Sequence, residues 1–341
     1  MDSAPLETEL VVPERPPRRR CRCFQCPPCN SCRCRVALAA GLLLFCALVG
    51  LITAWVIRPN SVEYSEDTAV RLAQLAGAAY CSRAALEAWT CGSKCLTSVS
   101  KPVKVCQGET TQAFVARWEG DALISFEGTK SYLSMVQDLR IWKNLTDWKS
   151  HGKVHEGFLI EWESLRRCVK DALTSLSSPA GSHIKVTGHS LGGAVGVIAM
   201  VDLVSEGWLV REGYTFGMPR PGDAAFARTF DGMFFRRFYR VTHHMDPVPH
   251  VPPEEMGFQH LASEVFYDAD VKRGFVRCPR AEDERCAGKY WDVPHDLLHI
   301  SDHKDYMDQD TGSEGCEGAE KTRPTRPRLR VGSKAINSKR R

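Results

Sequence analysis

Acidic residues are missing from two stretches of this 341-residue sequence, one near each end of the chain. Residues 15–35 contain seven arginines, residues 321–341 contain nine lysines or arginines, and neither stretch has an aspartate or a glutamate. The whole chain is only mildly basic, with a formal net charge of +4, so its charge does not favour nucleic acid as a partner. Both basic runs lie outside the part of the sequence that is typical of a folded domain, so we expect them to be solvated or to face a membrane.

Charge of either sign is absent from residues 36–57, which form one continuous apolar run. At about 1.5 Å per residue, a helix of this length spans a bilayer core of roughly 30 Å. A cleaved signal peptide is the alternative, but the run is longer than the apolar region of such a peptide and lacks a clear small-x-small cleavage site. The run therefore predicts a transmembrane signal anchor. The arginines before it predict a cytosolic N-terminus, with everything after the span in the lumen or outside the cell.

The 15 cysteines are distributed in a way that fits this topology. Eight of them, an even number, follow the apolar run, where up to four disulfides can form in an oxidising compartment. Six others crowd residues 21–34, within a Pro- and Arg-rich segment, residues 1–35, that is predicted to be disordered. Zinc sites usually separate two CxxC pairs by a loop, so juxtamembrane S-acylation of this cluster is favoured over metal binding. Asn144 heads the only Asn-x-Ser/Thr glycosylation sequon in the chain, which agrees with export.

Residues 61–310 alternate between helix-like and strand-like patterns, which predicts one α/β domain with a mostly parallel sheet and crossover helices. Helical spacing of apolar residues occurs over 68–80, 158–176 and 191–204. Short apolar or β-branched runs predict strands at 113–118, 122–126, 184–187, 214–216 and 238–242, the first two as a hairpin. Residues 311–341 are basic and rich in Pro and Gly, and they predict a flexible tail.

The segment Gly188-His189-Ser190-Leu191-Gly192 fits the pattern G-x-S-x-G. The pattern is informative only between a strand and a helix, and the predicted elements supply both. The glycines allow a strained turn without side-chain collisions, and the serine hydroxyl is then held at a helix N-terminus, where developing negative charge is favoured. Ser190 is therefore predicted to be a nucleophile, with a serine in an ordinary glycine-rich turn as the alternative.

A serine nucleophile needs a base, and the base needs an orienting carboxylate, in the chain order Ser, acid, His. Asp246 follows a predicted strand in a proline-stiffened loop, where catalytic groups of open α/β sheets are found. An aspartate that caps a turn before proline is the alternative. Composition does not distinguish among the later histidines, which are His250, His260, His295, His299 and His303.

Nine short motifs follow one another between about residues 70 and 307: AAYC, ISFEGTKS, QDL, VHEGF, TGHSLGGA, TFGMPRPGDAAFA, YRVTHHMDPVPHVPP, GFQH and HKDYM. In this order they resemble the class 3 (fungal-type) triacylglycerol lipase family. The resemblance implies an α/β-hydrolase fold and a catalytic triad of Ser190, Asp246 and His303. Met307 stands where the family's H-x-x-Y-F motif ends in an aromatic residue.

The resemblance also implies an oxyanion hole formed by the backbone amides of Leu191 and Thr129. Glu127 stands where the family usually has arginine, which reverses a charge close to the hole but leaves the backbone donors unchanged. A lid is expected over residues 131–145, with a core helix as the alternative. Its apolar side chains share one helical face: Tyr132, Met135, Val136, Leu139 and Trp142.

The family pattern further suggests disulfides. Cys81 resembles a cysteine that pairs with one near the C-terminus, here Cys316. Two more pairs are expected, Cys91 with Cys95 and Cys278 with Cys286, and Cys106 and Cys168 are left without an assignment.

These observations together predict a membrane-anchored serine lipase that hydrolyses carboxylic esters of glycerolipids at a membrane or droplet surface, without a metal or organic cofactor. A phospholipase or a mono- or diacylglycerol lipase on the same scaffold is one alternative. A catalytically silent lipid-binding or partner-binding module is another.

Overall fold

The computed structural model describes residues 63–130, 144–176, 183–290, 299–312 and 316. All of them belong to the unit Ser61–Arg341. The predicted transmembrane span, 36–57, lies outside the described residues, as do the apolar positions of the expected lid. Within the described part of the chain, no helix is both long enough and apolar enough to cross a membrane.

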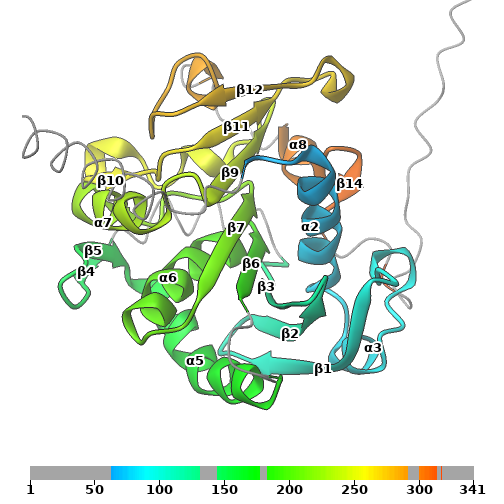
Figure 1. The fold of residues 1–341 in the computed structure, drawn as a ribbon. Helices are drawn as coiled ribbons and strands as arrows, with labels where there is room; N and C mark the ends of the chain where they lie inside the picture. Colours follow the sequence, from blue (N-terminus) through cyan, green and yellow to red (C-terminus); the bar gives the residue numbers. More distant parts are fainter. Residues whose placement is uncertain (1–62, 131–143, 177–182, 291–298, 313–315, 317–341) are drawn as a thin grey trace, which may run out of the picture. The chain divides into compact units, whose positions relative to one another are not determined.

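An eight-stranded sheet forms the centre of the domain (Figure 1). Its strand order is β1-β2-β3-β6-β7-β9-β11-β12. The five strands from β3 to β11 are parallel to one another, while β1, β2 and β12 are added antiparallel at the two ends. The strands are β1 (Val99–Gln107), β2 (Gln112–Trp118), β3 (Asp121–Phe126), β6 (Ile184–His189), β7 (Val210–Phe216), β9 (Phe238–His243), β11 (Glu264–Tyr267) and β12 (Phe275–Cys278). The expected hairpin and the mostly parallel sheet are thus confirmed.

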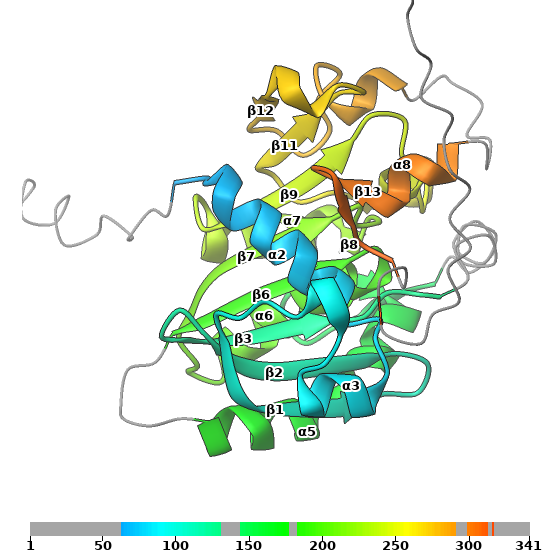
Figure 2. The same cartoon turned by 90° about the vertical axis from the view of Figure 1, so that its right-hand side faces the viewer.

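Helices cover both faces of this sheet, which explains why nearly every residue of the central strands is buried. On one face lie α5 (Glu156–Leu176), α6 (Leu191–Ser205) and α7 (Ala224–Phe234), packed against alternate strand residues such as Val115 and Ile124. On the other face lies α2 (Glu66–Ala78), which packs against their strand neighbours, including Phe114 and Leu123. Figure 2 shows α2 crossing that face. This two-sided alternation follows from the period of two along each strand.

The remaining elements are short. A small sheet has the order β10-β8-β5-β4, and a two-stranded sheet pairs β13 with β14. Their bounds are β4 (Leu145–Asp147), β5 (Lys153–His155), β8 (Gly222–Asp223), β10 (Phe258–Gln259), β13 (Asp305–Tyr306) and β14 (Gln309–Asp310). The short helices are α3 (Arg83–Ala88), α8 (Ile300–Lys304) and the 3₁₀ turns η1 (Gly92–Lys94), η2 (Val248–His250), η3 (Glu254–Met256), η4 (Val271–Arg273) and η5 (Ala287–Tyr290).

Four disulfides join the eight cysteines that follow the predicted span. The pairs are Cys81–Cys316, Cys91–Cys95, Cys278–Cys286 and Cys106–Cys168. The last pair, which the sequence left unassigned, links β1 to α5, because α5 packs over that end of the sheet.

The Cys106–Cys168 link closes a loop of 62 residues, whereas Cys91–Cys95 closes one of only 4. Loop-closure entropy of the unfolded chain grows with loop length, so the long link contributes more stability. We predict that Cys106→Ser combined with Cys168→Ser lowers the free energy of unfolding by about 4 kcal/mol, and that the matched Cys91→Ser, Cys95→Ser pair lowers it by about 2 kcal/mol. Denaturant unfolding under oxidising conditions measures both, and equal losses would contradict the prediction.

Candidate active site

Ser190 occupies a strained turn between β6 and α6. β6 ends at His189, α6 begins at Leu191, and Ser190 between them has φ 59° and ψ −132°. Its backbone N–H donates to the carbonyl of Phe216 on the neighbouring strand, at 2.8 Å. A Cβ on Gly188 would collide with the backbone of Gly192. The turn therefore requires the glycine spacing of the motif, and it presents the serine at the first residue before a helix.

Asp246 and His303 form a buried hydrogen-bonded pair. Asp246 lies in the loop after β9 and His303 in α8, and each side chain is at most 1% exposed. The distance from His303 Nδ1 to Asp246 Oδ2 is 2.9 Å. Since a carboxylate only accepts, Nδ1 carries the proton and Nε2 is the basic nitrogen of the ring. This is the base-and-orienter arrangement that activates a serine hydroxyl.

Asp246 has two further donors. The N–H of Val248 donates to Oδ1 at 2.8 Å, and the hydroxyl of Tyr306 donates to Oδ2. Burial, together with the neighbouring Asp246 carboxylate, raises the pKa of Tyr306 well above its ordinary value. The phenol therefore keeps its proton and remains a donor, which helps to hold the carboxylate in one orientation.

The other candidate histidines have different partners. His260 Nε2 donates to the carbonyl of Pro249, and His299 lies 3.7 Å from a carboxylate oxygen of Asp302. His250 lies in the loop that follows Asp246, with its carbonyl bound by Arg220. His295 is outside the described residues. Of the described candidates, His303 is the one that the fold brings to Asp246.

A second imidazole, His189, links the turn of Ser190 to the segment that carries His303. Its Nε2 lies 2.7 Å from the carbonyl oxygen of His303, and its Nδ1 lies 2.8 Å from the hydroxyl of Tyr80. A carbonyl only accepts, so Nε2 donates to it and Nδ1 accepts from Tyr80. Burial lowers the pKa of His189 well below its ordinary value, and His303 lowers it further. A neutral, fully buried ring therefore holds the segment of His303 against the residue before Ser190.

Sequence reasoning did not identify His189, Tyr80 or Tyr306 as parts of the site. The signal was present, because each is a polar residue inside one of the recognised motifs, TGHSLGGA, AAYC and HKDYM. Only the long-range contacts reveal what they do.

The turn that carries Thr129 lies against Ser190. A Cβ on Gly128 would be 2.6 Å from the carbonyl oxygen of His189 and 3.0 Å from the Cβ of Ser190. Glycine at this position allows the end of β3 to approach the start of α6 so closely. Thr129, next along the chain, and Leu191, the first residue of α6, thus come from two segments that meet beside Ser190.

Glu127 is buried beside this turn, 3% exposed, where the family usually has arginine. Its Oε2 accepts from the backbone N–H of Gln112 at 3.1 Å, and its Oε1 lies 3.2 Å from Lys130 Nζ. Burial raises the pKa of Glu127 to about 7, against the opposing effect of Lys130. The reversed charge therefore has a local ionic partner of its own.

The remaining predicted positions are peripheral to this cluster or cannot be placed. Asn144 is exposed, and its side-chain amide donates to Glu156 at 3.0 Å. In the part of the chain that the structure describes, no three His, Cys, Asp or Glu residues are grouped so as to hold a metal ion. The expected lid residues lie outside the described residues: Tyr132, Met135, Val136, Leu139 and Trp142.

A serine on a strand–helix turn, beside a buried Asp–His pair at the end of a mostly parallel sheet, is typical of the α/β hydrolases.

Comparisons with known proteins indicate which family of α/β hydrolases this chain resembles. Residues 123–256 match the family model "Lipase (class 3)". A secreted mono- and diacylglycerol lipase of Gibberella zeae is 41% identical over 124 residues, covering 33% of this chain and 30% of that protein. A lipase of Rhizopus niveus is 33% identical over 198 residues, covering 55% and 48% respectively.

Solved structures of lipases also resemble this chain. Lipase II of Rhizopus niveus matches with a TM-score of 0.60 and 29% identity, over 72% of this chain and 96% of that one. A triacylglycerol lipase whose catalytic centre is a serine protease triad matches with a TM-score of 0.61 and 27% identity, over 74% and 98%. The chain spans between about a third and a half of the length of the curated relatives just described. The matches support the class 3 lipase family for this chain.

The raised pKa of Glu127 predicts a pH-dependent contribution to stability. The folded protein binds this proton more tightly than the unfolded chain, whose value is near 4.5. The resulting stability is complete below about pH 4.5 and is lost as pH rises to about 7. We predict that Glu127→Gln, which stays neutral, gains stability relative to the wild type between pH 5 and pH 8, on the order of 2–3 kcal/mol.

Unfolding of both proteins at the two pH values measures this gain, because all other titrating groups are shared and cancel. A difference between wild type and variant that is the same at pH 5 and pH 8 would show that Glu127 does not hold its proton in the folded state.

Proposed function

We propose that the domain is a serine lipase that hydrolyses carboxylic esters of glycerolipids through an acyl-enzyme. The observation that carries this proposal is the buried hydrogen bond between His303 Nδ1 and Asp246 Oδ2, in a fold that holds Ser190 in the turn between β6 and α6. A hydrogen-bonded Asp–His pair supplies a base of fixed tautomer, which a lipid-binding module does not need.

Acylation uses each member of the triad once. The hydroxyl oxygen of Ser190 attacks the acyl carbon while its proton passes to Nε2 of His303. Asp246 stabilises the imidazolium that forms, and the same proton then passes to the departing glycerolipid alcohol. Water repeats the sequence on the acyl-enzyme, releases the fatty acid and restores Ser190.

The tetrahedral intermediates carry an oxyanion, for which we assign the amides of Leu191 and Thr129 as donors. Donors fixed in the backbone need no reorganisation when the charge develops, and the loss of one typically costs about 100- to 1,000-fold in rate. The contact of the Gly128 turn with Ser190 supports this assignment, because it brings both amide-bearing segments to the nucleophile.

The substrate class is proposed from chemistry and relatives together. Ester chemistry alone accommodates tri-, di- and monoacylglycerols and phospholipids. The Gibberella zeae relative and one from Fusarium solani are secreted mono- and diacylglycerol lipases, which favours partial glycerides as an alternative to triacylglycerol. The lid over residues 131–145 and the glycan at Asn144 remain predictions of the sequence.

Ser190→Ala is expected to abolish fatty-acid release from every lipid that the wild-type chain hydrolyses, because no other group takes the acyl chain. Ser205→Ala, at the far end of α6, is the matched control and should keep wild-type activity. Fatty-acid release from tri-, di- and monoacylglycerol and from phospholipid by the full chain under oxidising conditions measures this and ranks the substrates. A wild-type chain that releases no fatty acid and does not react with a fluorophosphonate probe would instead identify a silent binding module.

We also propose that residues 36–57 anchor this domain, 61–310, in a membrane, with segment 1–35 cytosolic and the tail 311–341 beyond the domain. The unbroken apolar run supports the anchor, and four disulfides support an oxidising compartment.

Alkaline extraction of membranes from cells that express the full chain tests the anchor. The protein should stay in the membrane pellet, whereas a chain that starts at residue 61 and carries a cleavable leader should be released. Full chain in the alkaline supernatant would contradict the anchor.

A further inference from the structure

The acid loop, residues 246–253, begins with Asp246 and is bound to neighbouring segments through its backbone carbonyls. It contains only the short turn η2, yet four successive carbonyls, those of residues 249–252, are all bound from outside the loop. Arg220 donates hydrogen bonds to three of these carbonyls, and His260 donates to the fourth. A segment whose carbonyls are fixed in this way cannot shift without breaking several buried hydrogen bonds.

Arg220 is the main anchor of the acid loop. Its Nη1 donates to the carbonyls of His250 and Pro252, at 2.7 and 3.0 Å, and its backbone N–H donates to Val251 at 2.9 Å. The side chain is only 2% exposed. A guanidinium buried to this degree needs carboxylate partners, because an unpaired buried charge is costly. Glu254 is one of them, with Oε1 3.3 Å from Nη2, and Glu282 is the other.

His260 is the second anchor. Its Nε2 donates to the carbonyl of Pro249 at 2.6 Å. Burial, followed by Arg240 and Arg220, lowers the pKa of His260 well below its ordinary value. The ring therefore stays neutral, and it keeps the single proton on the nitrogen that holds Pro249.

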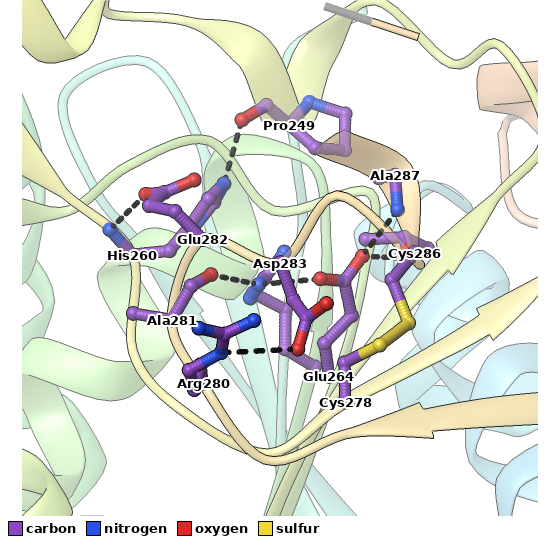
Figure 3. Close-up of polar contacts among 12 residues, drawn as sticks. Pro249, His260, Glu264, Cys278, Arg280, Ala281, Glu282, Asp283, Cys286 and Ala287 are labelled. Carbon is purple, nitrogen blue, oxygen red and sulfur yellow. Dashed lines mark hydrogen bonds and ion pairs between the residues drawn. A yellow bond between two sulfur atoms is a disulfide. The ribbon is translucent and has the colours of Figure 1, made fainter. Parts of the chain in front are cut away.

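The carboxylate of Glu282 accepts hydrogen bonds from both Arg220 and His260. Its two oxygens receive Nε and Nη2 of Arg220 at 3.0 and 3.1 Å, a bidentate pair. The backbone N–H of His260 donates to the same Oε1 at 2.9 Å. Figure 3 shows Glu282 reaching His260, with the His260 ring in contact with the Pro249 carbonyl beyond it.

Glu282 belongs to the disulfide loop, residues 278–286, closed by Cys278–Cys286. The carbonyl of Ala281 accepts from Arg240 at 2.8 Å, and the buried Asp283 pairs with Arg285 at 2.7 Å. Between this loop and the acid loop lies a polar hollow of about 650 Å³ that Arg220, His260 and Glu282 help to line. Polar contacts through Arg220 and His260, neither of which lies in either loop, therefore connect the two loops here, and Figure 3 shows the contacts of His260.

We propose that Glu282 is a positioning residue for the catalytic acid. Through Arg220 and His260 it fixes the acid loop and thereby the orientation of Asp246 toward His303. The inference rests on the proposed function, since it assigns Glu282 a role in the same reaction. The disulfide loop, which is more than 30 residues along the chain from Asp246, would then contribute to catalysis through Glu282. This contribution requires no contact with the reacting atoms.

The test compares Glu282→Ala with Glu284→Ala in the full chain. Glu284 lies in the same loop and lines the same hollow, and among the residues that the structure describes it has no ion-pair or hydrogen-bond partner. Turnover of a soluble short-chain ester is measured, with active sites counted by the stoichiometry of fluorophosphonate labelling. Glu282→Ala should lower kcat per labelled site between about 10- and 100-fold with little change in KM, the scale expected of a misplaced catalytic group. Glu284→Ala should leave kcat per labelled site unchanged.

A double-mutant cycle separates positioning from a general loss of structure. In an Asp246→Asn background, Glu282→Ala should have no further effect on kcat per labelled site, because the group that it positions is already disabled. Glu282→Gln, which keeps an oxygen acceptor for His260, should recover part of the lost kcat.

Three results would overturn the inference, and each has its own meaning. Equal kcat per labelled site for the Glu282 and Glu284 variants would remove any role for Glu282 in the reaction. A full additional loss in the Asp246→Asn background would show that Glu282 acts independently of the acid. A wild-type chain that neither hydrolyses ester nor labels would overturn the proposed function itself.

Discussion

One carboxylate oxygen, Oδ2 of Asp246, joins the loop after β9 to a segment of the chain 57 residues away. It accepts hydrogen bonds from His303 and Tyr306 in the C-terminal part of the domain, and the other oxygen accepts from Val248. A buried carboxylate is costly unless donors surround it. The loop after β9, the short helix α8 and strand β13 therefore hold their relative places in part because this charge has to be satisfied.

Features of the fold and the site that depend on neighbouring residues could be predicted from the sequence, whereas features that depend on contacts between distant residues could not. The strand–turn–helix around Ser190 follows from local sterics, so the sequence GHSLGG indicated it directly, and the structure places the turn there. The choice among five histidines does not follow from local sequence, because the base is defined by a contact between residues 57 positions apart. Only the family resemblance selected His303.

The same reasoning explains what was missed. Cys106 and Cys168 could not be assigned because their pairing needs the packing of α5 over β1, which is a tertiary fact. Strand β1 was not predicted either. Its burial pattern is irregular, with three exposed residues in succession at Ser100–Pro102, and its register shifts in the same stretch, so the alternation that identifies a strand is broken.

The Cys81–Cys316 disulfide has a mechanical consequence. It joins positions 235 residues apart, and Cys81 follows directly on Tyr80, which bonds to His189. A pull on the chain beyond residue 316 is therefore borne by a covalent bond to the segment just after α2. The force bypasses residues 300–312, so the segment that carries His303 is shielded from tension on the basic tail.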